Sequence, residues 1–159
     1  MDIEETFQVD NEDLSTKFKD LQRRLHPDKF ANKSPVEKEY SEQQSSLINK
    51  AYTTLQKPLD RGVYLLEQNK VYLEEDETIA EPEFLLSMME INEEIESSND
   101  EVSLMELDKE NKLRIESIIS SLKDAFEKRE LKNAKKLLIE LRYIMNIDNK
   151  ISDKIRHLF

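Results

Sequence analysis

The sequence predicts an all-α protein, and three observations carry this prediction. The 159 residues include a single glycine, Gly62, whereas β-hairpins and barrels use glycine at their turns. Apolar residues recur at intervals of three and four, among abundant Glu and Lys, as on amphipathic helices. The chain has no cysteine, but at this length one medium domain or two small ones can bury enough apolar surface to fold without disulfides.

The first predicted helix carries apolar residues at intervals of four, three and four: Leu14, Phe18, Leu21 and Leu25. Asn11 or Asp13 is its expected N-cap, because Asn and Asp side chains accept from the first free N–H groups. The helix must end near Pro27, since a proline disfavours helical geometry in the residue before it. A loop rich in turn residues, "HPDKFANKSP", follows.

A second predicted helix begins after Ser34, with Pro35 at its first position and Glu37 completing a capping box. Its expected buried stripe is Tyr40, Gln44, Leu47, Ala51 and Leu55. Two helices of similar length joined by a short loop pack antiparallel. The first two helices are therefore expected to form a hairpin whose tip carries residues 26–28, "HPD".

The acidic stretch "LEEDETIAEPE" predicts a boundary between two halves, 1–73 and 74–159. Before it, Pro58 breaks the second helix and a short third helix is expected. After it, the expected helices run from about 82 to 96, 102 to 128 and 131 to 146. Three helices of these lengths predict a C-terminal antiparallel three-helix bundle.

Two helices of this bundle carry more apolar residues than one buried face needs. In "FLLSMMEINEEIE" the conventional face is Phe84, Met88, Ile91 and Ile95. Leu85, Leu86 and Met89 lie away from that face. On the last helix, Ile139 and Tyr143 point away from the expected buried face, which consists of Ala134, Leu137, Leu138, Leu141, Ile144 and Met145. These extra residues either pack under another segment or form a docking patch rimmed by Glu90, Glu93 and Arg142.

The net charge of −11 argues against general nucleic-acid binding. Residues 14–33 nevertheless hold six basic residues against two acids, whereas residues 74–101 hold twelve acids and no base, so two surfaces of opposite sign are expected. No apolar run reaches the length of a membrane span, which predicts a soluble protein that does not bind membranes. Two distant histidines and no cysteine predict no metal site with histidine or cysteine ligands. A carboxylate-only magnesium or calcium site is the alternative, although the sequence has no EF-hand spacing.

The triplet His26, Pro27 and Asp28 has several interpretations. It can simply terminate a helix, because proline stops helices and aspartate favours turns. As an acid–base pair of a hydrolase it is poor, since no nucleophile or oxyanion donor accompanies it. Its context is informative: a basic helix, HPD at the turn, then an amphipathic helix ending "INKAYTTLQKPLDRGVYLL" resembles the J domain of DnaK-type chaperone partners.

In detail, "LQRRLHPDKF", "RGVYLL" and "FLLSMMEINEEIE" resemble the HscB/Jac family, the J-domain co-chaperones of iron–sulfur cluster biogenesis. The resemblance implies a non-enzymatic protein without cofactors that brings a cluster-assembly scaffold to a DnaK-type chaperone and stimulates its ATPase. It implies that the chaperone is contacted by His26, Pro27 and Asp28 with Lys17, Arg23, Arg24 and Lys29. It implies that the scaffold is contacted by Leu85, Leu86, Met89 and Tyr143 beside Glu90, Glu93 and Arg142.

The chain also departs from the family. J domains normally begin with a helix, and "MDIEETFQVD" leaves little room for one, so this helix is expected to be short or missing. Animal relatives often carry a cysteine-rich metal-binding segment, and without cysteines no zinc is expected here. Details of "EPEFLLSMMEIN" and "RGVYLL" resemble the mitochondrial members, which implies the mitochondrial matrix, with the bacterial cytoplasm as the alternative. A helical interaction module without chaperone coupling is the rival function.

Overall fold

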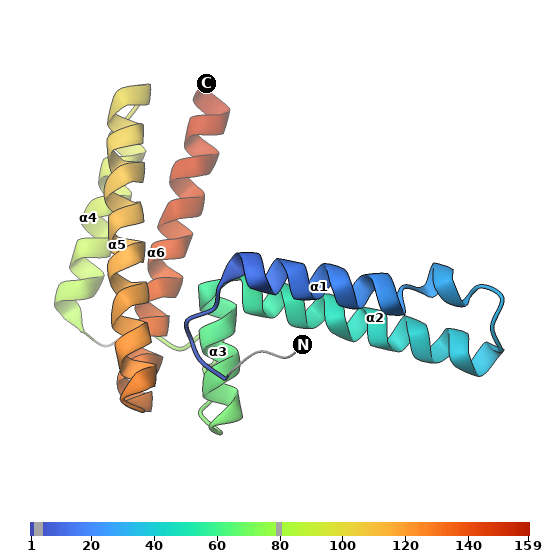
Figure 1. Cartoon of the computed structure of the whole chain (residues 1–159). Coiled ribbons are helices and arrows are strands. Elements are labelled where there is room, and N and C mark those ends of the chain that lie inside the picture. Colours follow the sequence, from blue (N-terminus) through green and yellow to red (C-terminus); the bar gives the residue numbers. More distant parts are fainter. Residues whose placement is uncertain (2–4, 79–80) are drawn as a thin grey trace. The chain divides into compact units, whose positions relative to one another are not determined.

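The computed structural model describes residues 1, 5–78 and 81–159. Within this part of the chain it contains six α-helices, one short 3-10 helix and no strand (Figure 1). The prediction of an all-α chain is therefore confirmed. The chain forms two compact units, Met1–Leu65 and Leu66–Phe159.

Helix α1 spans Asn11–Leu25 and is capped by Asp10, whose carboxylate accepts from the N–H groups of Glu12 and Asp13. The predicted caps Asn11 and Asp13 were wrong, because both lie inside the first turn. The predicted end was confirmed: His26, which precedes Pro27, has extended backbone geometry (φ −60°, ψ 135°).

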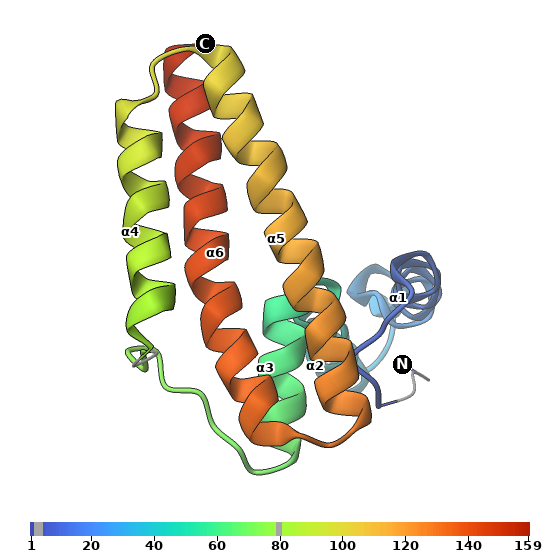
Figure 2. The ribbon, with the colours of Figure 1, turned by 90° about the vertical axis from the view of Figure 1, so that its left-hand side faces the viewer.

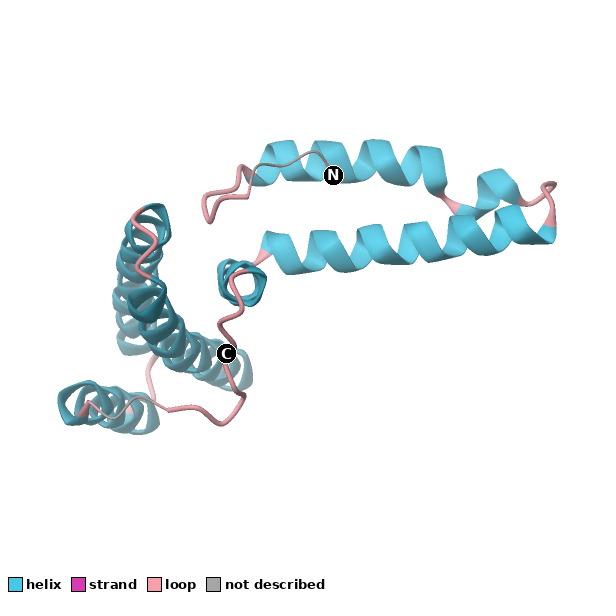
Figure 3. Cartoon of the chain, turned by 90° about the horizontal axis from the view of Figure 1, so that it is seen from below, coloured by secondary structure: helices cyan, strands magenta, loops and turns pink. Residues whose placement is uncertain are grey.

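Helix α2 spans Pro35–Gln56 and runs beside α1 (Figures 1 and 3). The predicted cap is confirmed, since Glu37 N donates to Ser34 Oγ at 3.3 Å. The predicted stripe was wrong in part, because Tyr40 and Leu47 are 60% and 59% exposed. The buried residues are instead Ser41, Ser45 and Ile48. Small serines let the two helices approach closely and bond to α1 through their hydroxyl groups.

The segment before α1 is held by Arg61 of helix α3, which spans Pro58–Gln68. Phe7 is buried, its carbonyl accepts from Arg61 Nε at 2.6 Å, and the guanidinium lies 5.0 Å from the ring centroid. Arg61 Nη1 also donates to Leu55 O at 2.7 Å. Burial lowers the pKa of Arg61. Residues 5–10 contain no helix, and the rest of the predicted short helix, residues 2–4, lies outside the described residues.

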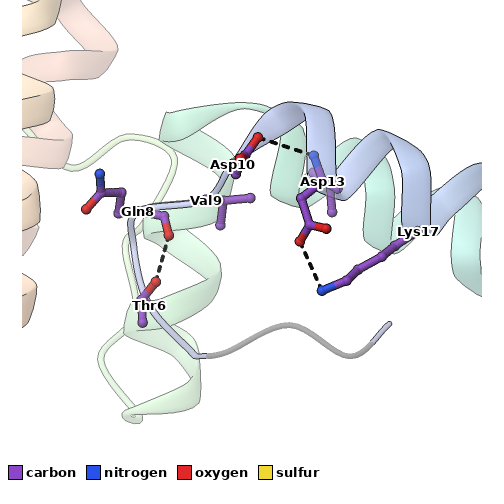
Figure 4. Close-up of a pocket in the computed structure, with 7 residues that line it drawn as sticks. Thr6, Gln8, Val9, Asp10, Asp13 and Lys17 are labelled. Carbon is purple, nitrogen blue, oxygen red and sulfur yellow. Dashed lines mark hydrogen bonds and ion pairs between the residues drawn. The ribbon is translucent and has the colours of Figure 1, made fainter.

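A small hollow of about 270 Å³ lies beside the first turn of α1 (Figure 4). Thr6 Oγ1 donates to Gln8 O at 2.7 Å, and Asp10 accepts from Asp13 N at 3.2 Å. Lys17 pairs with Asp13 at 3.0 Å along the same wall. These polar contacts shape the start of α1.

The second unit contains the predicted three-helix bundle: α4 (Pro82–Ser97), α5 (Glu101–Glu127) and α6 (Leu131–Leu158). Helix α6 packs against both other helices, most extensively against α5 (Figure 2). The predicted end of the last helix at Asn146 was wrong, because α6 continues to Leu158. Ile147 and Ile151 are buried in this extension, and their burial holds it in the bundle.

Candidate functional site

The tip of the α1–α2 hairpin is built from His26, Pro27 and Asp28. His26 ends α1, where its N–H donates to Gln22 O at 2.9 Å, and it also caps the 3-10 helix η1 (Pro27–Phe30). Its Nδ1 accepts from Asp28 N at 3.3 Å. Pro27 occupies the first position of η1, where a missing N–H costs no hydrogen bond. The triplet is therefore a rigid turn in which the imidazole caps the backbone.

The carboxylate of Asp28 points to solvent. Its side chain is 92% exposed, and its Oδ2 lies 3.6 Å from His26 Nδ1. Ser41 of α2 holds the end of α1 at this turn: it is fully buried, and its hydroxyl donates to Leu25 O at 2.8 Å. The sequence reasoning missed Ser41, although serines four residues apart, Ser41 and Ser45, are a signal of close helix packing. The turn therefore presents the Asp28 carboxylate to solvent on a loop that is held by hydrogen bonds.

The predicted basic residues differ in how freely their charges are available. Lys17 pairs with Asp13 at 3.0 Å, and Arg24 pairs with Asp20 at 2.9 Å, each one helical turn away. The side chains of Arg23 and Lys29 are exposed. Arg23, Arg24 and Lys29 are thus exposed at the surface of α1 and η1, whereas Lys17 is half-buried.

The predicted apolar patch lies on α4 and α6. Leu86 and Met89 are 57% and 60% exposed, whereas Leu85 is half-buried. Tyr143 is half-buried and packs edge-on against Phe84, with ring centroids 5.8 Å apart. Two of the four predicted apolar residues, Leu86 and Met89, are thus open to solvent on α4, where Glu90 and Glu93 are exposed as well.

Arg142, predicted on the rim of the patch, is occupied by this chain's own backbone. Its Nη1 donates to Glu74 O and Glu75 O at 3.0 and 3.2 Å, and its Nη2 donates to Glu77 O at 2.9 Å. Lys135 pairs with Glu77 at 2.8 Å, which lowers the pKa of that carboxyl. Arg142 therefore holds the segment before α4 against α6.

Ile139 does not belong to the patch. The sequence predicted that its side chain points away from the core, but it is only 5% exposed. The face of α6 that carries Ile139 also carries Lys135 and Arg142, which bind the segment before α4. The expectation was wrong because tertiary packing buries a helix face that periodicity alone leaves open.

Other kinds of site have no support in the part of the chain that is described. No group of three or more His, Cys, Asp or Glu residues there could hold a metal ion. None of the described helices is long and apolar enough to cross a membrane. His26 Nδ1 accepts from the backbone of Asp28 at the turn, so it caps the chain there.

The fold defines an all-helical class of protein, with a hairpin unit and a three-helix bundle. The chain is 36% identical to the human iron–sulfur cluster co-chaperone protein HscB over 97% of the chain's own length. The match covers 66% of the human protein, so the chain spans less than two thirds of that relative. It is 36% identical to a co-chaperone protein HscB homologue of Neisseria meningitidis, covering 96% of the chain and 95% of the relative. The chain therefore belongs to the HscB family of co-chaperones, a family of non-enzymatic proteins.

Two further comparisons agree with this placement. A family model described as "HSCB C-terminal oligomerisation domain" matches residues 80–152, which include all of α4 and α5 and most of α6. The crystal structure of human co-chaperone protein HscB superposes with a TM-score of 0.93, covering 97% of this chain and 79% of that chain at 36% identity. The predicted family resemblance is thus confirmed.

Proposed function

We propose that this protein is a co-chaperone of iron–sulfur cluster biogenesis. It delivers a cluster-assembly scaffold protein to a DnaK-type chaperone and stimulates the chaperone's ATPase, which promotes cluster transfer. Residues 1–73 act as the J domain, and residues 74–159 bind the scaffold. The observation that carries the proposal is the braced hairpin tip, which exposes 92% of the Asp28 side chain in a chain of the HscB family.

The tip contacts the chaperone. His26 caps the turn and Pro27 stiffens it, so Asp28 loses little conformational freedom when it pairs with a cation of the partner. A charge-assisted hydrogen bond of this kind is about twice as strong as a neutral one. Arg23 and Lys29 steer the approach to an acidic surface, together with Lys17 and Arg24, and should change the association rate more than the final affinity.

The apolar patch contacts the scaffold. Leu86 and Met89 expose more than half of their surface, and each fully buried side chain of this size contributes roughly 1.5 to 3 kcal/mol. Leu85 and Tyr143 are already half-buried, and Tyr143 packs on Phe84, so they lose less side-chain freedom on binding than fully exposed residues. Exposed Glu90 and Glu93 form an acidic rim that favours a basic partner surface. Arg142 supports the surface by holding the preceding segment.

The proposed compartment is the mitochondrial matrix, with the bacterial cytoplasm as the alternative. The proposal rests on the likeness of "EPEFLLSMMEIN" and "RGVYLL" to mitochondrial members of the family. The source cells can be fractionated and the protein detected in each fraction with an antibody. A signal only in the cytoplasmic fraction would exclude the mitochondrial matrix.

A chaperone ATPase assay with and without scaffold tests the proposed function. Asp28→Asn should abolish stimulation while scaffold binding persists. The triple variant Leu85→Ala, Met89→Ala, Tyr143→Ala should abolish scaffold binding while basal stimulation persists. If folded Asp28→Asn stimulates like the parent protein, the chain is a helical interaction module without chaperone coupling. If each variant loses both activities while folded, the two-surface assignment is wrong.

A further inference from the structure

A groove of the bundle adjoins the patch: Glu90 of the patch rim also lines the groove, and so does Phe84, which packs on Tyr143. Helices α4 and α5 both pack on α6, and a groove of about 530 Å³ lies between their facing sides. Ile144 of α6 forms its floor, and the apolar side chains of its walls are Phe84, Met88, Ile91 and Ile118. Phe84 and Ile118 are only half-buried. The groove occupies the place that a fourth helix fills in a four-helix bundle.

The charges on the two walls are unequal. On the α5 wall, Arg114 Nη2 pairs with Glu110 Oε2 at 3.4 Å, so these charges offset each other. On the α4 wall, Glu90 and Glu94 line the groove without an ion pair to any described residue. These two acids belong to the stretch of residues 74–101, which contains twelve acids and no base. The groove is therefore apolar below and acidic along one edge.

We infer that this groove binds an amphipathic helix with an apolar stripe flanked by Lys or Arg. The apolar stripe would cover Phe84 and Ile118, and the basic residues would pair with Glu94. An amphipathic helix in an apolar groove is a recurrent mode of recognition. Positions 84 to 94 of α4 span about 15 Å at 1.5 Å per residue, so the bound helix needs about three turns. The residues that carry this inference, Phe84, Glu94 and Ile118, are none of the residues assigned to the scaffold patch or the hairpin tip.

The probe is a synthetic helical peptide of about 14 residues, with Leu on one stripe and Lys on both flanks. Two control peptides have the same length: one has the same composition in scrambled order, and one has Glu in place of Lys. Fluorescence anisotropy measures their binding to the full chain. The Leu/Lys peptide should bind at least about tenfold tighter than either control, with affinity falling as salt rises. Equal binding of the ordered and scrambled peptides overturns the inference.

Substitutions in the groove distinguish binding in the groove from nonspecific attraction of a basic peptide to an acidic protein. Ser87 lines the groove, so Ser87→Trp should fill it and weaken peptide binding about tenfold or more. The matched control is Ser120→Trp on an exposed position of α5 outside the groove, which should change nothing. Scaffold binding should survive Ser87→Trp. If both tryptophan variants bind the peptide like the parent chain, the groove is not its site.

Charge substitutions give effects of opposite sign. Glu94→Gln should weaken binding about threefold and reduce its salt dependence, because it removes an unpaired acid. Arg114→Gln should tighten binding about threefold, because it frees Glu110 for the basic peptide. If neither substitution changes the affinity, the assignment of basic peptide residues to the acidic edge of the groove is wrong. Sedimentation of the protein alone excludes the remaining occupant: a dimer that Ser87→Trp dissociates would show that a second copy covers the groove instead.

Discussion

Ser41 should determine how well the hairpin tip is presented. It is fully buried, and its hydroxyl donates to Leu25 O at 2.8 Å, one residue before His26. Ser41→Ala deletes this bond and leaves the carbonyl unsatisfied in the hairpin. The expected loss of unfolding free energy is about 1 kcal/mol, since a typical intramolecular hydrogen bond contributes about 0.5 to 1.5 kcal/mol.

The same energy sets the functional effect. If the bond is lost from the native turn, the competent tip is populated at most about fivefold less, and the apparent affinity for the chaperone falls by that factor. The half-maximal concentration for ATPase stimulation should therefore rise up to about fivefold, while stimulation at saturation remains. Asp28→Asn differs because it removes the contact itself and should abolish stimulation at any concentration.

Chaperone ATPase titration and urea unfolding measure the two effects on the same samples. The control is Ser46→Ala, an exposed serine of α2, which should change unfolding by less than about 0.5 kcal/mol and leave the titration unchanged. If Ser41→Ala destabilises the hairpin but the half-maximal concentration does not move, the turn is rigid without this bond. The argument that Ser41 organises the tip would then be refuted.

Three further predictions concern the bundle. Ile151→Ala should cost about 2 to 5 kcal/mol in urea unfolding, because Ile151 is fully buried in the extension of α6, and a neutral result would mean that this extension does not pack. Burial raises the pKa of Glu140, so its charged form opposes folding at neutral pH, and Glu140→Gln should stabilise the protein there. The gain should shrink as the pH falls below that raised pKa and vanish below the ordinary pKa of a glutamate carboxyl, which urea midpoints of both proteins across this pH range will show. Arg142→Gln frees three carbonyls of the segment before α4, so a glutamate-specific protease should cleave at Glu74 or Glu77 about tenfold faster; unchanged cleavage would show that Arg142 does not hold this segment.

The helix ends illustrate what local sequence can specify. Pro27 and Ser34 set the end of α1 and the start of α2 through backbone sterics and a single side-chain bond, so both were predictable. The end of α6 was not predicted, because Asn146 and its polar neighbours weaken the pattern locally. Burial of Ile147 and Ile151 against the bundle outweighs that weak propensity.

The faces of helices were harder to predict than their existence. Periodicity identified Met88, Ile91 and Ile95 as core, because apolar residues there dominate one side. On α2 the large residues Tyr40 and Leu47 led to a wrong prediction of the buried face, because they are exposed and Ser41 and Ser45 are buried instead. A serine satisfies its hydroxyl only when a partner carbonyl is in reach, and the sequence of one helix does not contain that partner.

The sequence by itself determined that this chain is helical, where α1 and α2 meet, that HPD lies at their junction, and that it resembles the HscB/Jac family. These features depend on residues close together in the chain, through propensity, capping and hydrophobic period. The tertiary structure alone decided that Ile139 is covered, that Arg142 binds backbone carbonyls, and that an apolar groove with one acidic edge lies between α4 and α5. Those features depend on which surfaces meet in space, and packing between distant segments sets that.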